Sequence, residues 1–204
     1  MSTVKNYLSL VKFSHTIFAM PFALIGFVLG IAALKNNNIV LQTNEVIVRF
    51  CLVLVCMITA RSAAMGFNRY LDRHFDQLNP RTAIREIPSG IIKAEKALGF
   101  VIANALIFII ATYFINPICF YLAPVALFVI LFYSYTKRFT YLCHLVLGVG
   151  LSLAPIGAYL AVTGVFDILP LLFSFAIIFW VSGFDIIYSL QDAEFDKSLA
   201  LYSM

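Results

Sequence analysis

Two acidic segments, each at the end of a long apolar stretch, contain the residues of this sequence that are best suited to chemistry. In the first segment, Asn68, Asp72 and Asp76 follow one another at intervals of four residues. On an α-helix each such step turns about 40° beyond a full circle and rises about 6 Å, so the three side chains project from one face. We call this set the first acidic ladder.

The second acidic ladder has the same spacing and consists of Tyr188, Asp192 and Asp196, with Asp185 one turn earlier. Carboxylates beside a membrane are unfavourable unless a cation lies against them. Mg²⁺ prefers carboxylate and phosphate oxygens, and it commonly joins one or two carboxylates to the phosphates of a substrate. The two ladders therefore predict divalent metal ions that hold an anionic ligand, such as a diphosphate, between them.

The sequence as a whole has too few polar residues to cover a soluble protein. Of its 204 residues, 62% are hydrophobic and 12% are charged, a balance that is typical of an integral membrane protein. Six apolar runs are continuous for about the twenty residues that a membrane-spanning helix needs. We expect one all-α integral membrane domain, residues 1–204, with helices at Thr16–Leu34, Val46–Phe67, Ala97–Ile115, Cys119–Tyr135, Tyr141–Gly164 and Ile168–Ile187.

The basic residues gather on one side of the predicted membrane topology. Only Lys35 and Arg49 fall on the other side. The positive-inside rule therefore predicts that both termini and both ladders are cytoplasmic. The residues on the cytoplasmic side are Lys5, Lys12, Arg69, Arg73, Arg81, Arg85, Lys93, Lys96, Lys137, Arg138 and Lys197.

The basic residues are interleaved with carboxylates at helix ends, which suits a small phosphate ligand better than an extended nucleic acid. Arg81, Arg85, Lys137 and Arg138 are close to the ladders in this topology. They can stabilise the charge that builds on a departing diphosphate. We therefore expect a phosphate ligand and a lipid bilayer as partners, and no nucleic acid.

At these residues the sequence resembles the UbiA superfamily of membrane prenyltransferases. Further resemblance lies in the stretches FSHTIFAMPFALIG, YSYTKRFT and LGVGLSLAPIGAYLAVTG. The first family motif, N-x-x-x-D-x-x-x-D followed by R-T-x-x-R-x-x-x-x-G, is matched by Asn68, Asp72, Asp76, Arg81, Thr82, Arg85 and Gly90. The second motif, D-x-x-Y-x-x-x-D-x-x-x-D, is matched by Asp185, Tyr188, Asp192 and Asp196.

The resemblance implies Mg²⁺-dependent transfer of a polyprenyl group from its diphosphate to a hydroxyaryl carboxylate in quinone biosynthesis. Within the superfamily, the stretches FSHTIFAMPF and DIIYSLQDAEFD look most like those of bacterial inner-membrane enzymes that act on 4-hydroxybenzoate. A dihydroxynaphthoate of menaquinone synthesis stays open as the acceptor.

The resemblance also implies roles for the residues of the two ladders. Asp72 and Asp76 make one metal–diphosphate contact, which Asn68 assists, and Asp192 and Asp196 make a second. The remaining residues of the second motif, Asp185 and Tyr188, line the ring pocket or shield a carbocation.

Three histidines have weaker signals. His15, at the mouth of the first helix, is a candidate contact for the acceptor carboxylate. His74 lies about 200° from Asp72 around the helix and is expected to face elsewhere. His144 lies in an apolar run and is interpreted as a hydrogen-bonded packing residue rather than a base.

Family members typically have about nine membrane helices, and the resemblance therefore predicts that these 204 residues are the first two-thirds of such a bundle. The alternative that the chain is an inactive, truncated membrane protein stays open. A transporter is less consistent, because its ionisable residues are expected near the bilayer midplane. A CDP-alcohol phosphotransferase would have its acidic motif in one cluster, and ordinary helix salt bridges would not explain two matching ladders.

Overall fold

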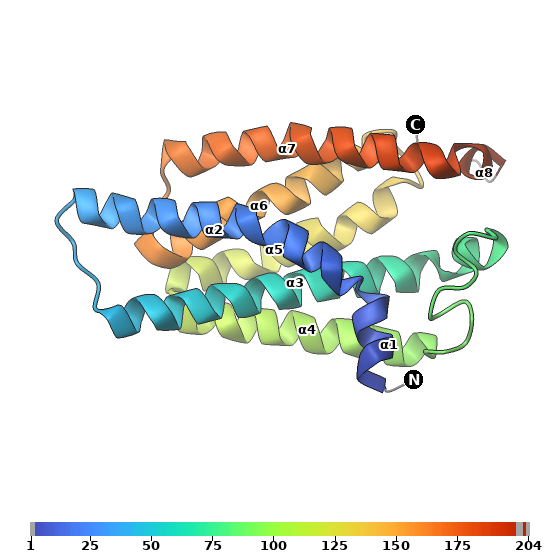
Figure 1. The fold of residues 1–204 in the computed structure, drawn as a ribbon, viewed down its shortest axis with the longest axis horizontal. Coiled ribbons are helices and arrows are strands. Elements are labelled where there is room, and N and C mark those ends of the chain that lie inside the picture. The colour runs from blue at the N-terminus through green and yellow to red at the C-terminus, as the bar shows by residue number, and fades with distance from the viewer. Residues whose placement is uncertain (1–2, 199–201, 203–204) are drawn as a thin grey trace.

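The computed structural model describes residues 3–198 and residue 202, without the side chains of residues 3, 13–18 and 196. In this part of the chain the helices lie side by side with their long axes close to one direction (Figure 1). Six of them are long and apolar enough to cross a membrane. The helices are α1 (Thr3–Leu10), α2 (Phe13–Asn36), α3 (Thr43–Leu78), α4 (Ala94–Ile115), α5 (Pro117–Thr136), α6 (Cys143–Thr163), α7 (Ile168–Ser189), the 3₁₀ turn η1 (Leu190–Asp192) and α8 (Ala193–Ser198).

All six predicted membrane helices are confirmed as α2 to α7, with ends that differ by a few residues except in α3. The 36 residues of α3 span about 54 Å, well beyond the roughly 30 Å of a bilayer core. The first acidic ladder is therefore on the same helix as a membrane span. The helix ends where Asn79, in an extended conformation, precedes Pro80, because a residue before proline is pushed out of the helical region.

The second acidic ladder is not on one regular helix, and that part of the prediction is wrong. Helix α7 ends at Ser189, and η1 separates it from α8. A 3₁₀ turn has three residues per turn, so the four-residue spacing of Tyr188 and Asp192 no longer keeps them on one face. The tighter turn coincides with the contacts that Asp192 makes to residues 79 and 81, which are described below.

Helix α6 is the most buried of the six candidate spans and lies between α2, α5 and α7. Glycines allow the closest contacts. A Cβ at Gly26 of α2 would lie 2.1 Å from the carbonyl oxygen of Pro155, and one at Gly148 would lie 2.5 Å from that of Ile178 on α7. Small residues of this kind let membrane helices approach backbone to backbone.

Residues 79–93, which join α3 to α4, form a folded segment rather than an open loop, and we call them the 79–93 segment. Leu10 of α1 is fully buried and packs with Ile87, Ile92 and Ala97. The Ser9 hydroxyl also bonds to a carboxylate of this segment, that of residue 86. Helix α1 thus attaches the segment to the start of α4, at the same end of the bundle as α8 (Figure 1).

Candidate active site

A polar cavity of about 510 Å³ lies at the ends of α3 and α7, next to the 79–93 segment. We call it the polar cleft. Of the predicted site residues whose side chains the structure describes, all but Arg138 line it. Those residues are Asn68, Asp72, Asp76, Arg81, Arg85, Lys137, Asp185, Tyr188 and Asp192. The side chains of His15 and Asp196 lie outside the described residues.

Asp72 is almost fully buried, at 3% exposure, and is surrounded by cations. Its Oδ2 atom lies 2.6 Å from Nζ of Lys137 and accepts a hydrogen bond of 3.3 Å from the Asn68 amide. The Arg138 guanidinium is 3.7 Å from Oδ1 and also donates to the carbonyl oxygen of Leu71. Arg138 therefore reaches Asp72 from outside the cleft lining.

Asp76, one helical turn later, has a different set of partners. Its Oδ1 atom accepts a bond of 2.6 Å from Nη1 of Arg85. Nη1 of Arg69, on the same helix, lies 4.0 Å from Oδ2. The Thr82 hydroxyl donates to the backbone carbonyl oxygen of Asp76 at 3.0 Å. The 79–93 segment thus closes over the end of the first ladder.

Each of these two aspartates keeps one buried oxygen that accepts no hydrogen bond: Oδ1 of Asp72 and Oδ2 of Asp76. Buried carboxylate oxygens without donors are suitable ligands for a hard cation. Among the described residues, no group of three or more His, Cys, Asp or Glu side chains is placed to hold a metal by itself. The residues therefore fit an Mg²⁺ ion that takes its remaining ligands from a phosphate substrate.

The 79–93 segment also reaches the second ladder. The Arg81 guanidinium contacts both oxygens of Asp192, with Nε at 2.9 Å from Oδ1, and the Asn79 amide donates to Oδ1 at 3.0 Å. The hydrogen bond to Asp192 raises the pKa of Arg81 above its usual range. Tyr188 lies beneath the guanidinium, with its ring centroid 5.9 Å from Cζ. The two predicted ladders are thus brought together through this segment.

Asp185 pairs with His144, which was interpreted from the sequence as a hydrogen-bonded packing residue, without an indication of its partner. Its Oδ2 atom lies 2.7 Å from Nδ1 of His144, near the start of α6. His74, in contrast, is exposed and does not line the cleft, as predicted. Nothing in the local sequence of His144 distinguishes it from a packing residue, because its partner is on another helix.

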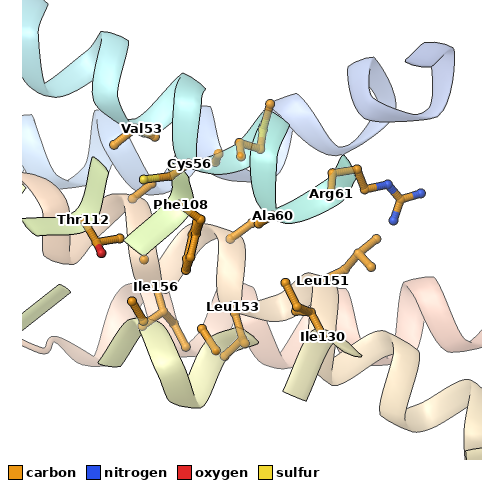
Figure 2. Close-up of a pocket in the computed structure, with 18 of the residues that line it drawn as sticks. Val53, Cys56, Ala60, Arg61, Phe108, Thr112, Ile130, Leu151, Leu153 and Ile156 are labelled. Atoms are coloured by element: carbon orange, nitrogen blue, oxygen red, sulfur yellow. The ribbon is translucent and has the colours of Figure 1, made fainter. Parts of the chain in front are cut away.

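A second cavity of about 230 Å³ adjoins the polar cleft and is lined almost entirely by apolar side chains (Figure 2). We call it the apolar cavity. It shares Arg61, Tyr133, Leu147 and Leu151 with the polar cleft. In Figure 2 the guanidinium group of Arg61 points away from the apolar side chains around it.

Arg61 was not among the site residues predicted from the sequence. Its Nε atom is buried without a hydrogen-bond partner. A charged residue inside the apolar run of α3 was the available signal, since such residues are unfavourable in a membrane unless they have a function.

The charges of the polar cleft favour an anionic ligand. Its described lining has more basic than acidic side chains, so the cleft stays cationic even when every aspartate is ionised. The basic residues are Lys12, Arg61, Arg69, Arg81, Arg85 and Lys137, and the acidic ones are Asp72, Asp76, Asp185 and Asp192.

The sequence matches the UbiA prenyltransferase family over residues 19–204. It is 34% identical over 143 residues, 70% of this chain, to the 4-hydroxybenzoate octaprenyltransferase of Tolumonas auensis, of which it covers 50%. It is 32% identical over 163 residues, 80% of this chain, to the enzyme of the same name from Photobacterium profundum, of which it covers 56%. The chain spans about half the length of these curated relatives.

Solved structures agree on the fold. An apo UbiA homologue from Aeropyrum pernix matches 93% of this chain and 68% of its own, with a TM-score of 0.81 at 32% identity. A UbiA homologue from Archaeoglobus fulgidus, bound to DMAPP and Mg²⁺, matches 98% of this chain and 68% of its own, with a TM-score of 0.73 at 21% identity. The fold and the lining of the polar cleft define an all-α membrane protein with acidic and basic side chains gathered at one end of its helices. The chain belongs to the UbiA prenyltransferase family.

Proposed function

We propose that this protein transfers a polyprenyl group from polyprenyl diphosphate to 4-hydroxybenzoate, with Mg²⁺, in the biosynthesis of a quinone. One observation carries the proposal. Asp72 and Asp76 each have a buried carboxylate oxygen that accepts no hydrogen bond, in a cationic cleft that adjoins an apolar cavity. The names of the relatives support the same chemistry.

The diphosphate binds at the first acidic ladder in this proposal. Asp72 and Asp76, each with a buried oxygen that accepts no hydrogen bond, would hold Mg²⁺, and Asn68 supports Asp72. Asp192 with Asp196 would provide a second contact. When bound, Mg²⁺ neutralises charge on the diphosphate and makes it a better leaving group. Four basic side chains that now contact the aspartates are close enough to turn to the diphosphate oxygens: Arg81, Arg85, Lys137 and Arg138.

The apolar cavity receives the prenyl tail. Its lining has very little polar surface, and a hydrocarbon chain gains about 0.8 kcal/mol for each CH₂ that it buries. Because the two cavities share four lining residues, a tail in the apolar cavity leaves its allylic carbon at their boundary. Arg61 is one of these shared residues and so lies at the boundary.

The acceptor binds at this boundary. Arg61 has a buried nitrogen without a hydrogen-bond partner, and a guanidinium binds a carboxylate through two parallel hydrogen bonds. The carboxylate of a hydroxyaryl acid on Arg61 puts the electron-rich ring beside the allylic carbon. Tyr133 lines both cavities and Asp185 lines the polar cleft, while a contact of His15 with the acceptor stays a prediction. A dihydroxynaphthoate also carries a carboxylate, so it is the alternative acceptor.

The polar cleft faces the cytoplasm in this proposal, and the protein lies in the bacterial inner membrane. The basic residues around the cleft and at the N-terminus favour that side. The diphosphate group and the water-soluble acceptor would then meet the site on the cytoplasmic side, while the prenyl tail stays in apolar surroundings.

The proposal is tested with membranes that carry the protein, from a host without its own prenyltransferase of this type. Isotope-labelled polyprenyl diphosphate is supplied with 4-hydroxybenzoate or with a dihydroxynaphthoate, in Mg²⁺ or in EDTA. We expect labelled product from 4-hydroxybenzoate only when Mg²⁺ is present. Product formed only from the naphthoate would identify the naphthoate, and not 4-hydroxybenzoate, as the acceptor. No product from either compound would contradict prenyl transfer by this chain.

A further inference from the structure

His144 is a titratable side chain of the polar cleft that contacts a predicted catalytic residue, Asp185, and has no role in the function proposed above. Its Nδ1 atom is 2.7 Å from Oδ2 of Asp185. The two side chains differ in exposure, because that of His144 is 5% exposed and that of Asp185 is 32% exposed. Asp185 therefore faces the open side of the pair, and His144 lies behind it.

The helices around the pair fix the position of His144. The Ser182 hydroxyl, on α7, donates to the backbone carbonyl oxygen of His144 at 3.1 Å. Gly148, one turn after His144, allows α6 to approach the backbone of α7 at Ile178 closely. The imidazole therefore has little freedom to turn away, and its bond with Asp185 is built into the contact between α6 and α7.

The other ring nitrogen of His144, Nε2, is buried and has no hydrogen-bond partner among the described residues. A buried polar atom without a partner costs about 1–3 kcal/mol. A residue that served packing alone would be better replaced by an apolar side chain, so the cost points to a use of the histidine.

We propose that His144 is a positioning residue that holds the Asp185 carboxylate toward the acceptor ring, so that Asp185 accepts the proton that the ring loses. The inference rests on the proposed prenyl transfer. The bond to His144 uses Oδ2 of Asp185, which leaves Oδ1 for the substrate. A carboxylate fixed on one oxygen presents the other in a defined direction, and such preorganisation is what a proton acceptor needs.

The step is balanced as follows. The allylic C–O bond breaks, and its electron pair leaves with the diphosphate. The allylic carbon bonds to the ring carbon next to the hydroxyl group. That carbon loses its hydrogen as a proton to Asp185, and the electron pair of the C–H bond restores the aromatic ring. Asp185 later releases the proton to water, and His144 stays hydrogen-bonded to it throughout.

The test compares His144→Ala with His144→Gln, using 4-hydroxybenzoate that carries deuterium at both ring positions next to the hydroxyl group. With the native protein we expect no isotope effect, because ring deprotonation follows the slower loss of diphosphate. The alanine variant should lose kcat by about 10- to 100-fold, as misplaced reactive groups do, and should show a primary isotope effect. The glutamine variant can still donate a hydrogen bond to Asp185, and we expect it to recover most of the rate without an isotope effect.

Ser182→Ala is the matched control, because it removes one hydrogen bond to the backbone at the same helix contact, while the close approach at Gly148 and the side chains of His144 and Asp185 are unchanged. It should show no isotope effect. Binding of magnesium with a non-reactive prenyl thiodiphosphate, measured on each variant, shows that the diphosphate site is still folded.

Three outcomes would overturn the inference, and they are distinguishable. If the native protein forms product and His144→Ala keeps its rate without an isotope effect, the positioning role is wrong and the proposed function stands. If the native protein forms no product with any acceptor, the proposed function fails and the role of His144 fails with it. An isotope effect in His144→Gln equal to that in the alanine variant would also contradict positioning through a hydrogen bond.

Discussion

The aspartates of the first ladder share one arrangement at the level of single atoms. Each has one oxygen bonded to a basic side chain and one oxygen without a hydrogen bond, Asp72 with Lys137 and Asp76 with Arg85. The basic partner fixes the orientation of the carboxylate, while the second oxygen stays available. Asp192 differs, since Arg81 contacts both of its oxygens. It can bind a metal only after Arg81 moves.

The negative charge that these aspartates share gives a prediction for Asp72→Asn and Asp192→Asn. Each change removes a negative charge that a metal–diphosphate complex needs, so we expect each to reduce prenyl transfer by about 100-fold or more. Membrane insertion should be unchanged. Glu194→Gln is the control, because Glu194 is exposed in α8 and does not line the polar cleft. Near-normal turnover in both aspartate variants, measured with labelled prenyl diphosphate, would reject the site.

Arg61 gives a second prediction at this scale. Arg61→Met keeps an unbranched apolar stem and removes the guanidinium and its charge. We expect KM for 4-hydroxybenzoate to rise by about 30-fold or more, because the loss of one partner in a buried charge pair costs at least about 2 kcal/mol. KM for the prenyl diphosphate should change little. A larger effect on the diphosphate than on the acceptor would place the carboxylate elsewhere.

At the scale of elements, the short helix α1 supports the 79–93 segment and thereby Arg81 and Arg85. Leu10 is the buried residue of this contact, and Leu8 on the same helix is 45% exposed. The contact is far from the ladders in sequence but acts on their partners. An N-terminal helix of eight residues thus contributes to the site without lining it.

We therefore predict different effects for Leu10→Ala and Leu8→Ala. The first removes a fully buried leucine, a change that costs about 2–5 kcal/mol where the surroundings do not collapse. Amides of the 79–93 segment should exchange hydrogen faster, and KM for the diphosphate should rise. Leu8→Ala should change neither. Equal exchange in both variants would show that α1 does not hold the segment.

The contact between α6 and α7 gives a prediction about stability. A Cβ at Gly148 would lie 2.5 Å from the backbone oxygen of Ile178, whereas one at Gly183 on α7 would meet nothing within 4 Å. Gly148→Ala should therefore lower the melting temperature, with an overpacking cost of about 1–3 kcal/mol. Gly183→Ala should leave it unchanged. Thermal unfolding in detergent measures both, and equal melting temperatures would mean that the helices separate easily.

The sequence predicts some of these elements better than others, for physical reasons. Long apolar runs identify α2 to α7 because a bilayer requires about twenty apolar residues per helix. The spacing from Asn68 to Asp76 predicts a helical ladder because nothing interrupts α3 before Pro80. The same spacing fails at Asp192, where contacts with Asn79 and Arg81 accompany a 3₁₀ turn. Local periodicity contains no information on such contacts between distant segments.

The pairs that complete the site are missed for the same reason. His144 and Asp185 come from different helices, and Arg61 is a candidate site residue only because it lies at the boundary between two cavities. Helix α1 is missed because eight residues with two lysines nearby give no apolar run of spanning length. Composition and motifs therefore predict which side chains react, but the partners that orient them depend on the packing of whole helices.

On the scale of the whole molecule, the polar groups are separated along the bundle axis. The polar cleft, the 79–93 segment, α1 and α8 lie at one end, and the turn from α2 to α3 lies at the other (Figure 1). Lys35 and Arg49 are the basic residues of that second end, and Arg49 donates to the backbone oxygen of Val162 there. The charge asymmetry favours the cleft end on the cytoplasmic side.

This orientation is tested with single cysteines in a variant without the four native cysteines. Ser89, in the 79–93 segment, and Asn37, after α2, are both exposed, so a thiol at either position is accessible to a reagent. A membrane-impermeant maleimide should label Ser89→Cys only in inside-out vesicles and Asn37→Cys only in intact cells with a permeable outer membrane. The positive-inside rule predicts this pattern because most of the basic residues flank the cleft. Reversed labelling would put the cleft outside, where cytoplasmic diphosphate could not reach it directly, and would defeat both the orientation and the proposed route of the substrates.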